Sequence, residues 1–350
     1  MSRGRSLGEG DFDGPIGGRL RRRREQTGRM GTVLFVLGMH RSGTSALSRV
    51  LSLAGARLPP DLCPPAGDNP TGFWEPKRAI ELNDAFVTSQ GSSLYDPSLI
   101  LQMTPPSEGD RRNFVLRIRT FFESFDIGAL TVLKDPRISV LLPFWLEAAK
   151  EAGHSAVAVQ IFRSPNQVAR SLAVRQNMAP AHALALWSSH NLLAERDARS
   201  LPRLFVSYDD LLRDWRSVVS RCADELGLRL IANAKVEANV GAFLNENLRH
   251  HHASNVESTG CPFAEATAER VFILLKDAAL RHIDQAAFDS ELTSLFENAP
   301  ILAEEATRDS WLLDVSLRDA LGRAEADVAE FERRTLTLDG VLRAAATEAH

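Results

Sequence analysis

Two stretches of the sequence combine cationic, hydroxyl and glycine residues in a pattern that suits an oxyanion. The first is Gly38-Met39-His40-Arg41-Ser42-Gly43-Thr44-Ser45, which lies between a short apolar run and a helical pattern. Its glycines permit a tight turn in which several backbone N–H groups face one point, and the helix that begins there adds its positive end. These features predict a loop that binds a phosphate or a sulfate group.

The cation of this loop is in an unusual place for nucleotide hydrolysis. Gly38 and Gly43 have the spacing of the glycines in GxxxxGK[ST], and Ser45 matches the last residue of that motif. Thr44 stands where the motif has lysine, and the cation of the loop is Arg41. No apolar strand ends in a convincing magnesium-binding aspartate. The loop therefore favours an anion held without a metal, and a P-loop kinase or NTPase is the alternative.

The second stretch pairs an arginine with a serine. Arg163 follows an apolar run, and Ser171 lies eight positions further on, in a helical pattern. A strand–turn–helix unit can bring both side chains to one phosphate, to which arginine offers a two-pronged guanidinium and serine a hydroxyl donor. This pair predicts a second phosphate site.

The elements that position these residues alternate between strand and helix. Short apolar runs predict buried strands at residues 33–37, 130–133, 156–162 and 204–207. Helical patterns cover residues 44–55, 77–90, 110–125, 141–152, 166–176, 181–199 and 209–226. The alternation predicts an α/β fold whose parallel sheet has helices on both faces. Beyond Gly227 the pattern is helical.

Three regions are expected along the chain. Residues 1–30 are rich in Gly and Arg without periodicity, which is typical of a disordered basic tail. Residues 31–262 form the main domain, and residues 263–350 a helical C-terminal extension. The stretch 311–346 reads as a long amphipathic helix that either packs back on its own chain or pairs with a second copy in a homodimer.

The composition narrows the function classes. The formal net charge of −4 gives no signature of a nucleic-acid partner, and no apolar run reaches the ~18 residues of a membrane span. Three cysteines without CxxC spacing argue against a disulfide framework or a zinc site. Three consecutive histidines at 250–252 cannot share one helix face as metal ligands. We therefore expect a cytoplasmic protein with no bound metal.

The motifs, taken together and in order, resemble those of sulfotransferases that use 3′-phosphoadenosine 5′-phosphosulfate (PAPS). The resemblance covers about residues 32–215. It rests on the Arg-Ser-Gly-Thr loop at 41–44, the pair Arg163 and Ser171, Lys134-Asp135-Pro136, and Tyr208-Asp209-Asp210-Leu211. The loop type is similar to that of tyrosylprotein sulfotransferases and of bacterial carbohydrate or small-molecule sulfotransferases. The fold implied is the P-loop NTPase-like sulfotransferase fold.

The resemblance implies an enzyme that moves a sulfuryl group from PAPS directly to an acceptor hydroxyl on a glycan or small molecule. Arg41 would contact the sulfuryl and bridging oxygens, and Lys134 would neutralise the sulfuryl group during transfer. Other positions that would hold the nucleotide are Ser42, Gly43, Thr44 and Ser45 for the 5′-phosphate, Arg163 and Ser171 for the 3′-phosphate, Tyr208 at the nucleotide's border and Arg249 in a closing loop. An inactive binding module with a sulfotransferase fold is a further alternative.

Two residues compete for the role of general base. Glu75 follows Phe73 and Trp74, an apolar pair that would raise the pKa of its carboxyl group; the alternative is an ordinary acid in the first turn of a helix. His40, in the phosphate loop, is the rival base. The acceptor is not named by the sequence.

Three further positions have two readings each, and a fourth has one. Trp187 and His190 either line the acceptor cleft or pack in the core. Arg137 either reaches a phosphate or an acceptor carboxylate, or it forms a surface ion pair. Asp135 is expected to order its own loop beside the preceding lysine.

Overall fold

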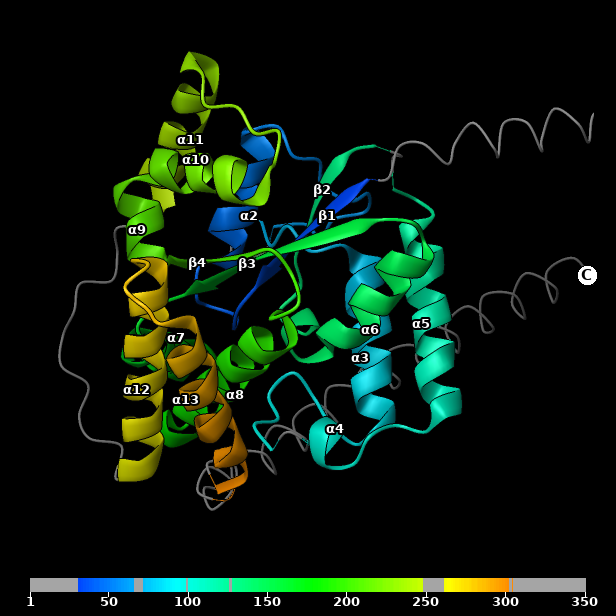
Figure 1. Cartoon of the computed structure of the whole chain (residues 1–350), viewed down its shortest axis with the longest axis vertical. Coiled ribbons are helices and arrows are strands. Elements are labelled where there is room, and N and C mark those ends of the chain that lie inside the picture. Colours follow the sequence, from blue (N-terminus) through cyan, green and yellow to red (C-terminus); the bar gives the residue numbers. More distant parts are fainter. Residues whose placement is uncertain are drawn as a thin grey trace, which may run out of the picture.

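A parallel β-sheet lies at the centre of the part of the chain that the computed structural model describes. The described residues are 31–65, 72–98, 100–125, 128–247, 261–301 and 304. Within them four strands, all paired in parallel, follow the order β2-β1-β3-β4 (Figure 1). Their bounds are Thr32–Leu37 for β1, Leu130–Leu133 for β2, Ser155–Phe162 for β3 and Arg203–Ser207 for β4. The predicted strands and the α/β class are confirmed.

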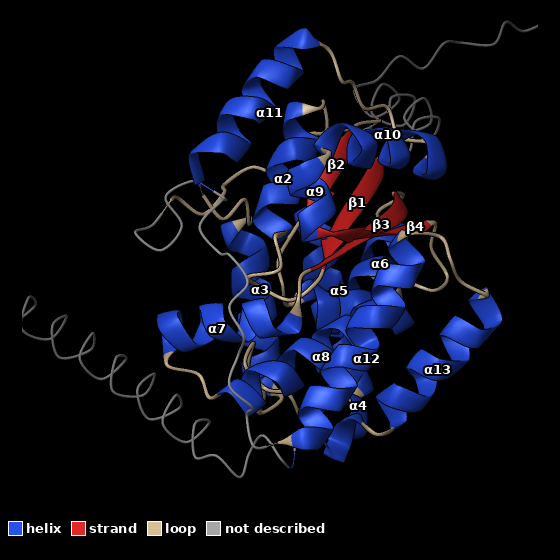
Figure 2. Ribbon diagram, turned by 90° about the vertical axis from the view of Figure 1, so that its left-hand side faces the viewer, coloured by secondary structure: helices blue, strands red, loops and turns tan. Residues whose placement is uncertain are grey.

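Helices cover both faces of this sheet, as Figures 1 and 2 show. The larger helices are α2 (Thr44–Leu53), α3 (Lys77–Ser89), α5 (Glu108–Phe122), α6 (Ile138–Glu151), α7 (Pro165–Gln176), α8 (Pro180–Asp197), α10 (Trp215–Leu226), α11 (Ala234–Asn247), α12 (Pro262–Ala279) and α13 (Gln285–Glu297). The short helices are α4 (Ile100–Met103) and α9 (Tyr208–Arg213). Most of the predicted helices are present, with ends that move by up to three residues.

Alternate side chains of β1 enter two different layers, because successive residues of a strand point to opposite faces. Leu34 and Val36 pack in an apolar cluster with α2, α10 and α11. Phe35 and Leu37 pack on the other side with α3, α5 and α6. All of β1 beyond its first residue is buried, which explains its continuous apolar sequence.

The helix predicted over 209–226 is wrong in one respect, because the structure divides it into α9 and α10. Asp214 lies between them with φ −148° and ψ 73°, far from helical values. Its carboxylate accepts a hydrogen bond from the backbone N–H of Ser217 at 3.1 Å. An aspartate that caps a new helix in this way competes with continuation of the old one.

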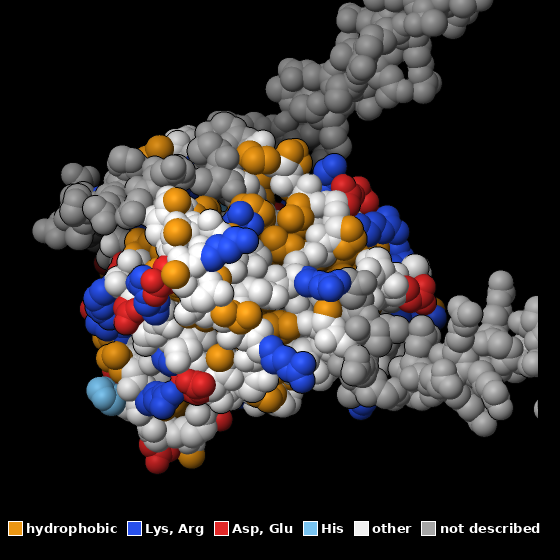
Figure 3. All heavy atoms as spheres, turned by 90° about the horizontal axis from the view of Figure 1, so that it is seen from above, with side chains coloured by type: hydrophobic (Ala, Val, Ile, Leu, Met, Phe, Trp, Pro, Cys, Tyr) orange, Lys and Arg blue, Asp and Glu red, His pale blue; other side chains and the backbone are white. Residues whose placement is uncertain are grey.

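The face of the molecule shown in Figure 3 carries side chains of both charges. On the face seen in Figure 3, basic, acidic and hydrophobic side chains are interspersed among the residues drawn in colour. No helix of the described part is both long and apolar enough to cross a bilayer. The predictions for residues 1–30, Arg249, the histidines 250–252 and the stretch 311–346 fall outside the described residues.

Candidate active site

Every strand of the sheet is followed at its carboxyl end by part of the predicted site. The loop 38–43 follows β1, Lys134 follows β2, Arg163 follows β3 and Tyr208 follows β4. The chain passes from β1 to a neighbour on one side and then to β3 on the other, so the order reverses between β1 and β3. Ligands of open parallel sheets bind at such a reversal, outside the carboxyl ends of the strands.

Two glycines of the loop admit no side chain. A Cβ on Gly38 (φ +130°) would lie 2.2 Å from the carbonyl oxygen of Ile161 in β3. A Cβ on Gly43 (φ +95°) would lie 2.2 Å from the Tyr208 ring. Arg41, between them, also has a positive φ of 68°, which is uncommon for a residue with a side chain. The loop is therefore held closely between β3 and the start of α9.

The start of α2 suits an oxyanion. Gly43 is its N-cap, and no side chain forms a capping hydrogen bond there. The first N–H groups of a helix have no partner within the helix and carry its partial positive charge. The Ser42 hydroxyl is fully buried beside them and has no hydrogen-bond partner among the described residues. Buried polar groups usually have partners, and a phosphate oxygen would be a suitable partner for these donors.

The two predicted phosphate motifs meet through a different pair of residues from the one expected. Arg41 Nε donates a hydrogen bond to Ser171 Oγ of α7 at 2.8 Å. Arg163 instead donates from Nε to Gln167 Oε1 at 2.7 Å, and its guanidinium lies 4.9 Å from the centre of the Tyr208 ring. The structure thus joins the first loop to the second motif through Arg41 and Ser171.

The two arginines at this junction, Arg41 and Arg163, are not balanced by nearby negative charges of the described chain. Burial lowers the pKa of both Arg41 and Arg163, and Arg41 further lowers the pKa of Arg163. Neither guanidinium forms an ion pair with a carboxylate of the described chain. Arginine stays charged even so, and partly buried cations without counterions favour a bound anion.

Glu75 lies outside any helix, which contradicts the reading of it as a first-turn helix acid. It precedes Pro76, the N-cap of α3, and only 9% of the residue is exposed. Burial raises the pKa of its carboxyl group, while the nearby Lys134 ammonium opposes that rise. Phe73 and Trp74, which were expected to form an apolar wall beside Glu75, make other contacts. The backbone carbonyl of Phe73 accepts a hydrogen bond from Lys134 at 3.4 Å, and the Trp74 ring stacks on Arg49.

Lys134 connects this acid to the phosphate loop. Its buried Nζ donates hydrogen bonds to the Glu75 carboxylate and, at 3.2 Å, to Ser45 Oγ in the first turn of α2. The hydroxyl of Ser45 in turn donates to the Phe73 carbonyl at 3.2 Å. The predicted catalytic acid, the predicted lysine and the phosphate loop therefore lie side by side.

His40 is a neutral, buried ring at the edge of the loop. Both of its ring nitrogens lack hydrogen-bond partners among the described residues. It makes edge-on contacts with Tyr95 and His190, at ring-centre distances of 5.5 and 6.4 Å. Burial holds its pKa well below the usual value, and the neighbouring His190 and cations add to this effect. No motif predicted a role for Tyr95, which reaches the site from a loop between α3 and α4.

Trp187 and His190 have different surroundings on α8. Trp187 is fully buried, and its indole N–H donates to the carbonyl of Arg163 at 3.1 Å. It is therefore a core residue that supports the second motif. His190 is also buried, and burial lowers its pKa to about 4. Its ring faces His40 at the site.

Arg137 and Asp135 are engaged with each other. The Asp135 carboxylate accepts hydrogen bonds from the backbone N–H of Arg137 at 3.1 Å and from its Nη1 at 2.9 Å. Arg137 also pairs with Asp84, and 13% of its side chain is exposed. Of the readings from sequence, the ion pair is the one present, although it is largely buried. Asp135 orders its own loop, as predicted.

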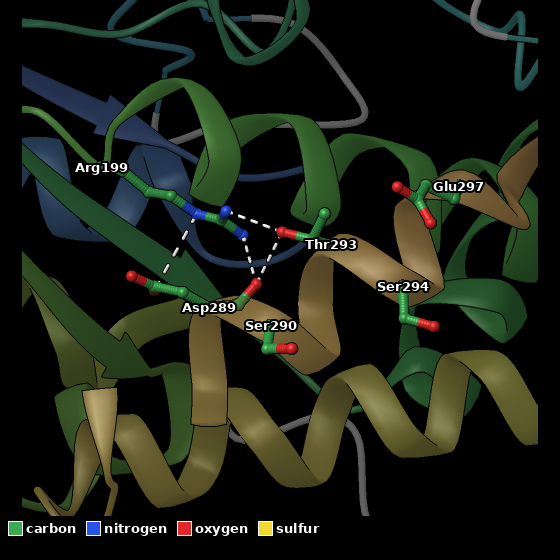
Figure 4. Close-up of a pocket in the computed structure, with 6 residues that line it drawn as sticks. All are labelled: Arg199, Asp289, Ser290, Thr293, Ser294 and Glu297. Carbon is green, nitrogen blue, oxygen red and sulfur yellow. Dashed lines mark hydrogen bonds and ion pairs between the residues drawn. The ribbon is translucent and has the colours of Figure 1, made fainter. Parts of the chain in front are cut away.

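A shallow hollow of about 400 Å³ lies elsewhere, beside α13 (Figure 4). Arg199 is its one cation, and this side chain already bonds to Thr293 Oγ1 at 2.8 Å and pairs with Glu195 and Asp289. Its charges are therefore matched within the protein, unlike those around Arg41. No group of three metal-ligand side chains gathers anywhere in the described part of the chain.

Among known proteins, the chain is similar to several solved structures. No family model and no curated protein matches the sequence. The sulfotransferase domain of the Synechococcus PCC 7002 olefin synthase is 17% identical, with 69% of this chain and 95% of that chain covered and a TM-score of 0.39. The sulfotransferase domain from the curacin biosynthetic pathway is 16% identical, with 71% and 98% covered and a TM-score of 0.38.

A third structure, sulfotransferase STF1 from Mycobacterium tuberculosis H37Rv, is 15% identical, with 65% of this chain and 75% of that chain covered and a TM-score of 0.38. All three are named as sulfotransferases, the class that the sequence motifs resemble. At these TM-scores the likeness carries no functional argument, which depends on the residues of the site.

Proposed function

We propose that this protein is a sulfotransferase that uses PAPS as its donor and a hydroxyl of a glycan or small molecule as its acceptor. The observation that carries this proposal is the 2.8 Å hydrogen bond from Arg41 Nε to Ser171 Oγ. It joins the loop suited to one oxyanion to the motif suited to another. A donor with a phosphosulfate at one end of a ribose and a 3′-phosphate at the other matches two such neighbouring anion sites.

Different residues of the chain would bind different parts of the nucleotide. The start of α2 would hold the 5′-phosphate through its N–H groups and hydroxyls, and Arg163 with Ser171 would hold the 3′-phosphate. The Tyr208 ring, which packs against Gly43, would border the nucleotide. Arg41 would contact the sulfuryl and bridging oxygens of the phosphosulfate, where charge develops during transfer.

The transfer needs no covalent intermediate on the protein. Bound PAPS would supply a sulfuryl group on a phosphosulfate linkage. The acceptor oxygen would bond to sulfur while the bond from sulfur to the bridging oxygen breaks, with its electron pair left on the 5′-phosphate. The acceptor proton would pass to the Glu75 carboxylate, with His40 as the alternative base. Catalysis would then be positioning and charge stabilisation.

Calorimetric titration with adenosine 3′,5′-bisphosphate, the desulfated product, tests this function without knowledge of the acceptor. We expect micromolar binding in the absence of magnesium and loss of most of that affinity in Arg163→Ala. Arg229→Ala removes an exposed arginine far from the motifs and is the matched control. Absence of binding, together with magnesium-dependent binding of ATP, would favour the kinase or NTPase alternative. Binding without transfer to any acceptor would favour the inactive module.

A further inference from the structure

Lys134 already uses all of its hydrogen-bond donors in the site, so it can bind an added anion only by losing a present partner. An ammonium has three N–H donors. Here they face Ser45 Oγ at 3.2 Å, the carbonyl of Phe73 at 3.4 Å and the carboxylate of Glu75. The side chain is 3% exposed, so no solvent-facing donor is left over. An anion at the start of α2 can gain this ammonium only if another partner gives it up.

Glu75 depends on Lys134 for its charge. Burial raises the pKa of the Glu75 carboxyl, and the carboxylate of Asp135 adds to that rise. Lys134 is the strongest opposing influence on this pKa, and Arg137, which is paired with two aspartates, is a weaker one. The remaining titratable neighbour, Cys63, is a thiol whose pKa the Glu75 carboxylate helps to raise. Loss of Lys134 would leave a buried carboxylate with little compensation.

We propose that Lys134 controls Glu75, by holding its carboxylate while the nucleotide is absent and leaving it for the nucleotide's 5′-phosphate end, at the start of α2, when the nucleotide binds. This proposal rests on the proposed function, and it adds a sequence of events: the donor binds first, and the base is released second. In the free protein the base is neutralised by an ion pair. In the donor complex the carboxylate is released next to the transferring group, where it can take the acceptor's proton. Lys134 thereby makes the base effective only after the donor is in place.

Proton linkage makes the switch measurable. If donor binding removes the counterion of Glu75, the carboxylate binds a proton more tightly in the complex. Binding must then draw a proton from solution over the pH range between the free and bound pKa values. By the same linkage, donor affinity falls as pH rises through that range, about tenfold for each unit by which the pKa is raised.

The experiment is calorimetry of adenosine 3′,5′-bisphosphate binding in buffers of different ionisation enthalpy. The slope of the observed binding enthalpy against the ionisation enthalpy of the buffer gives the number of protons taken up on binding. The ligand's own phosphates also titrate, so the quantity of interest is the uptake in the native protein minus that in Glu75→Gln. We expect a positive difference in the pH range between the free and bound pKa values, and none above that range, where the carboxylate stays ionised and can act as the base. We also expect Glu75→Gln to bind the ligand several-fold more tightly, because Lys134 no longer has to leave a carboxylate.

Variants of Lys134 separate control of the base from simple support of the structure. In Lys134→Gln the counterion is missing both before and after the ligand binds, so binding should no longer raise the pKa of Glu75, and the extra proton uptake should vanish while weaker binding remains. Lys134→Arg restores a cation and should restore part of the uptake. A merely structural role would change affinity or folding but would leave the Glu75-dependent uptake intact.

The outcomes distinguish this proposal from the function on which it rests. Normal nucleotide binding with no Glu75-dependent proton uptake would overturn the control by Lys134 and leave the sulfotransferase function standing. Uptake that persists unchanged in Lys134→Gln would also overturn it. Failure of the native protein to bind the nucleotide at all would instead overturn the proposed function.

Discussion

Arg41 Nε and Ser171 Oγ lie 2.8 Å apart, although 130 positions separate them in the sequence. The bond fixes a guanidinium that extends from a backbone with a positive φ, and it ties the loop after β1 to α7. Among the described residues, no carboxylate forms an ion pair with Arg41. A change at Arg41 should therefore affect chemistry more than folding.

Replacement of Arg41 by alanine should nearly abolish transfer while nucleotide binding stays measurable. The loss of one charged donor to a developing oxyanion typically costs ~10²–10³ in kcat. We expect a loss of that size with affinity for adenosine 3′,5′-bisphosphate weakened by roughly tenfold or less. Turnover of PAPS with a screened acceptor measures the first quantity, and calorimetry measures the second. Full turnover in Arg41→Ala would show that the mechanism is wrong.

Gly43→Ala should destabilise the protein more than Gly55→Ala does. Both glycines have positive φ, at +95° and +113°, so both substitutions impose strain of about 1–2 kcal/mol. At Gly55 nothing lies within 4 Å of the added Cβ, whereas at Gly43 it would meet the Tyr208 ring at 2.2 Å. Urea unfolding measures both free energies. Equal losses in the two variants would contradict the close packing of the loop on Tyr208.

Glu75 should give the pH profile of kcat its acidic limb. Burial raises the pKa of this carboxyl, so activity should rise with pH through a value above that of an ordinary glutamate and then level off. Glu75→Gln should lower kcat by ~10²–10⁴ and remove the limb. Burial holds the pKa of His40 well below its usual value. If His40→Asn removes the limb and Glu75→Gln keeps it, the assignment of the base reverses.

Acid should destabilise the fold through His190. Its pKa is about 4 in the folded protein, against ~6.5 when unfolded, so the unfolded chain binds the extra proton. Stability should be complete above about pH 6.5 and fall as pH drops toward 4, by on the order of 3 kcal/mol for this residue. Unfolding in urea at several pH values should show a shallower fall in His190→Asn. His282→Asn, at an exposed position, should leave the fall unchanged.

The sheet and its order of motifs could be predicted because both depend on local sequence. The strands are continuous apolar runs, and Arg163 and Lys134 directly follow two of them. The contact between Arg41 and Ser171 could not be predicted, since it depends on how α7 packs against the loop. The same holds for the ion pair of Glu75 and Lys134, which brings together segments 59 positions apart. The break at Asp214 was a local signal that the apolar periodicity of 209–226 obscured.

A crystal structure with adenosine 3′,5′-bisphosphate would show directly whether the two motifs hold the two phosphates. We expect the 5′-phosphate at the start of α2, within hydrogen-bond distance of Thr44 and Ser45. We expect the 3′-phosphate on Arg163 and Ser171, with Arg41 at the 5′-phosphate oxygen that carried the sulfuryl group. Nucleotide bound elsewhere, for example in the hollow beside Arg199, or a site filled only by ATP with magnesium, would overturn these assignments.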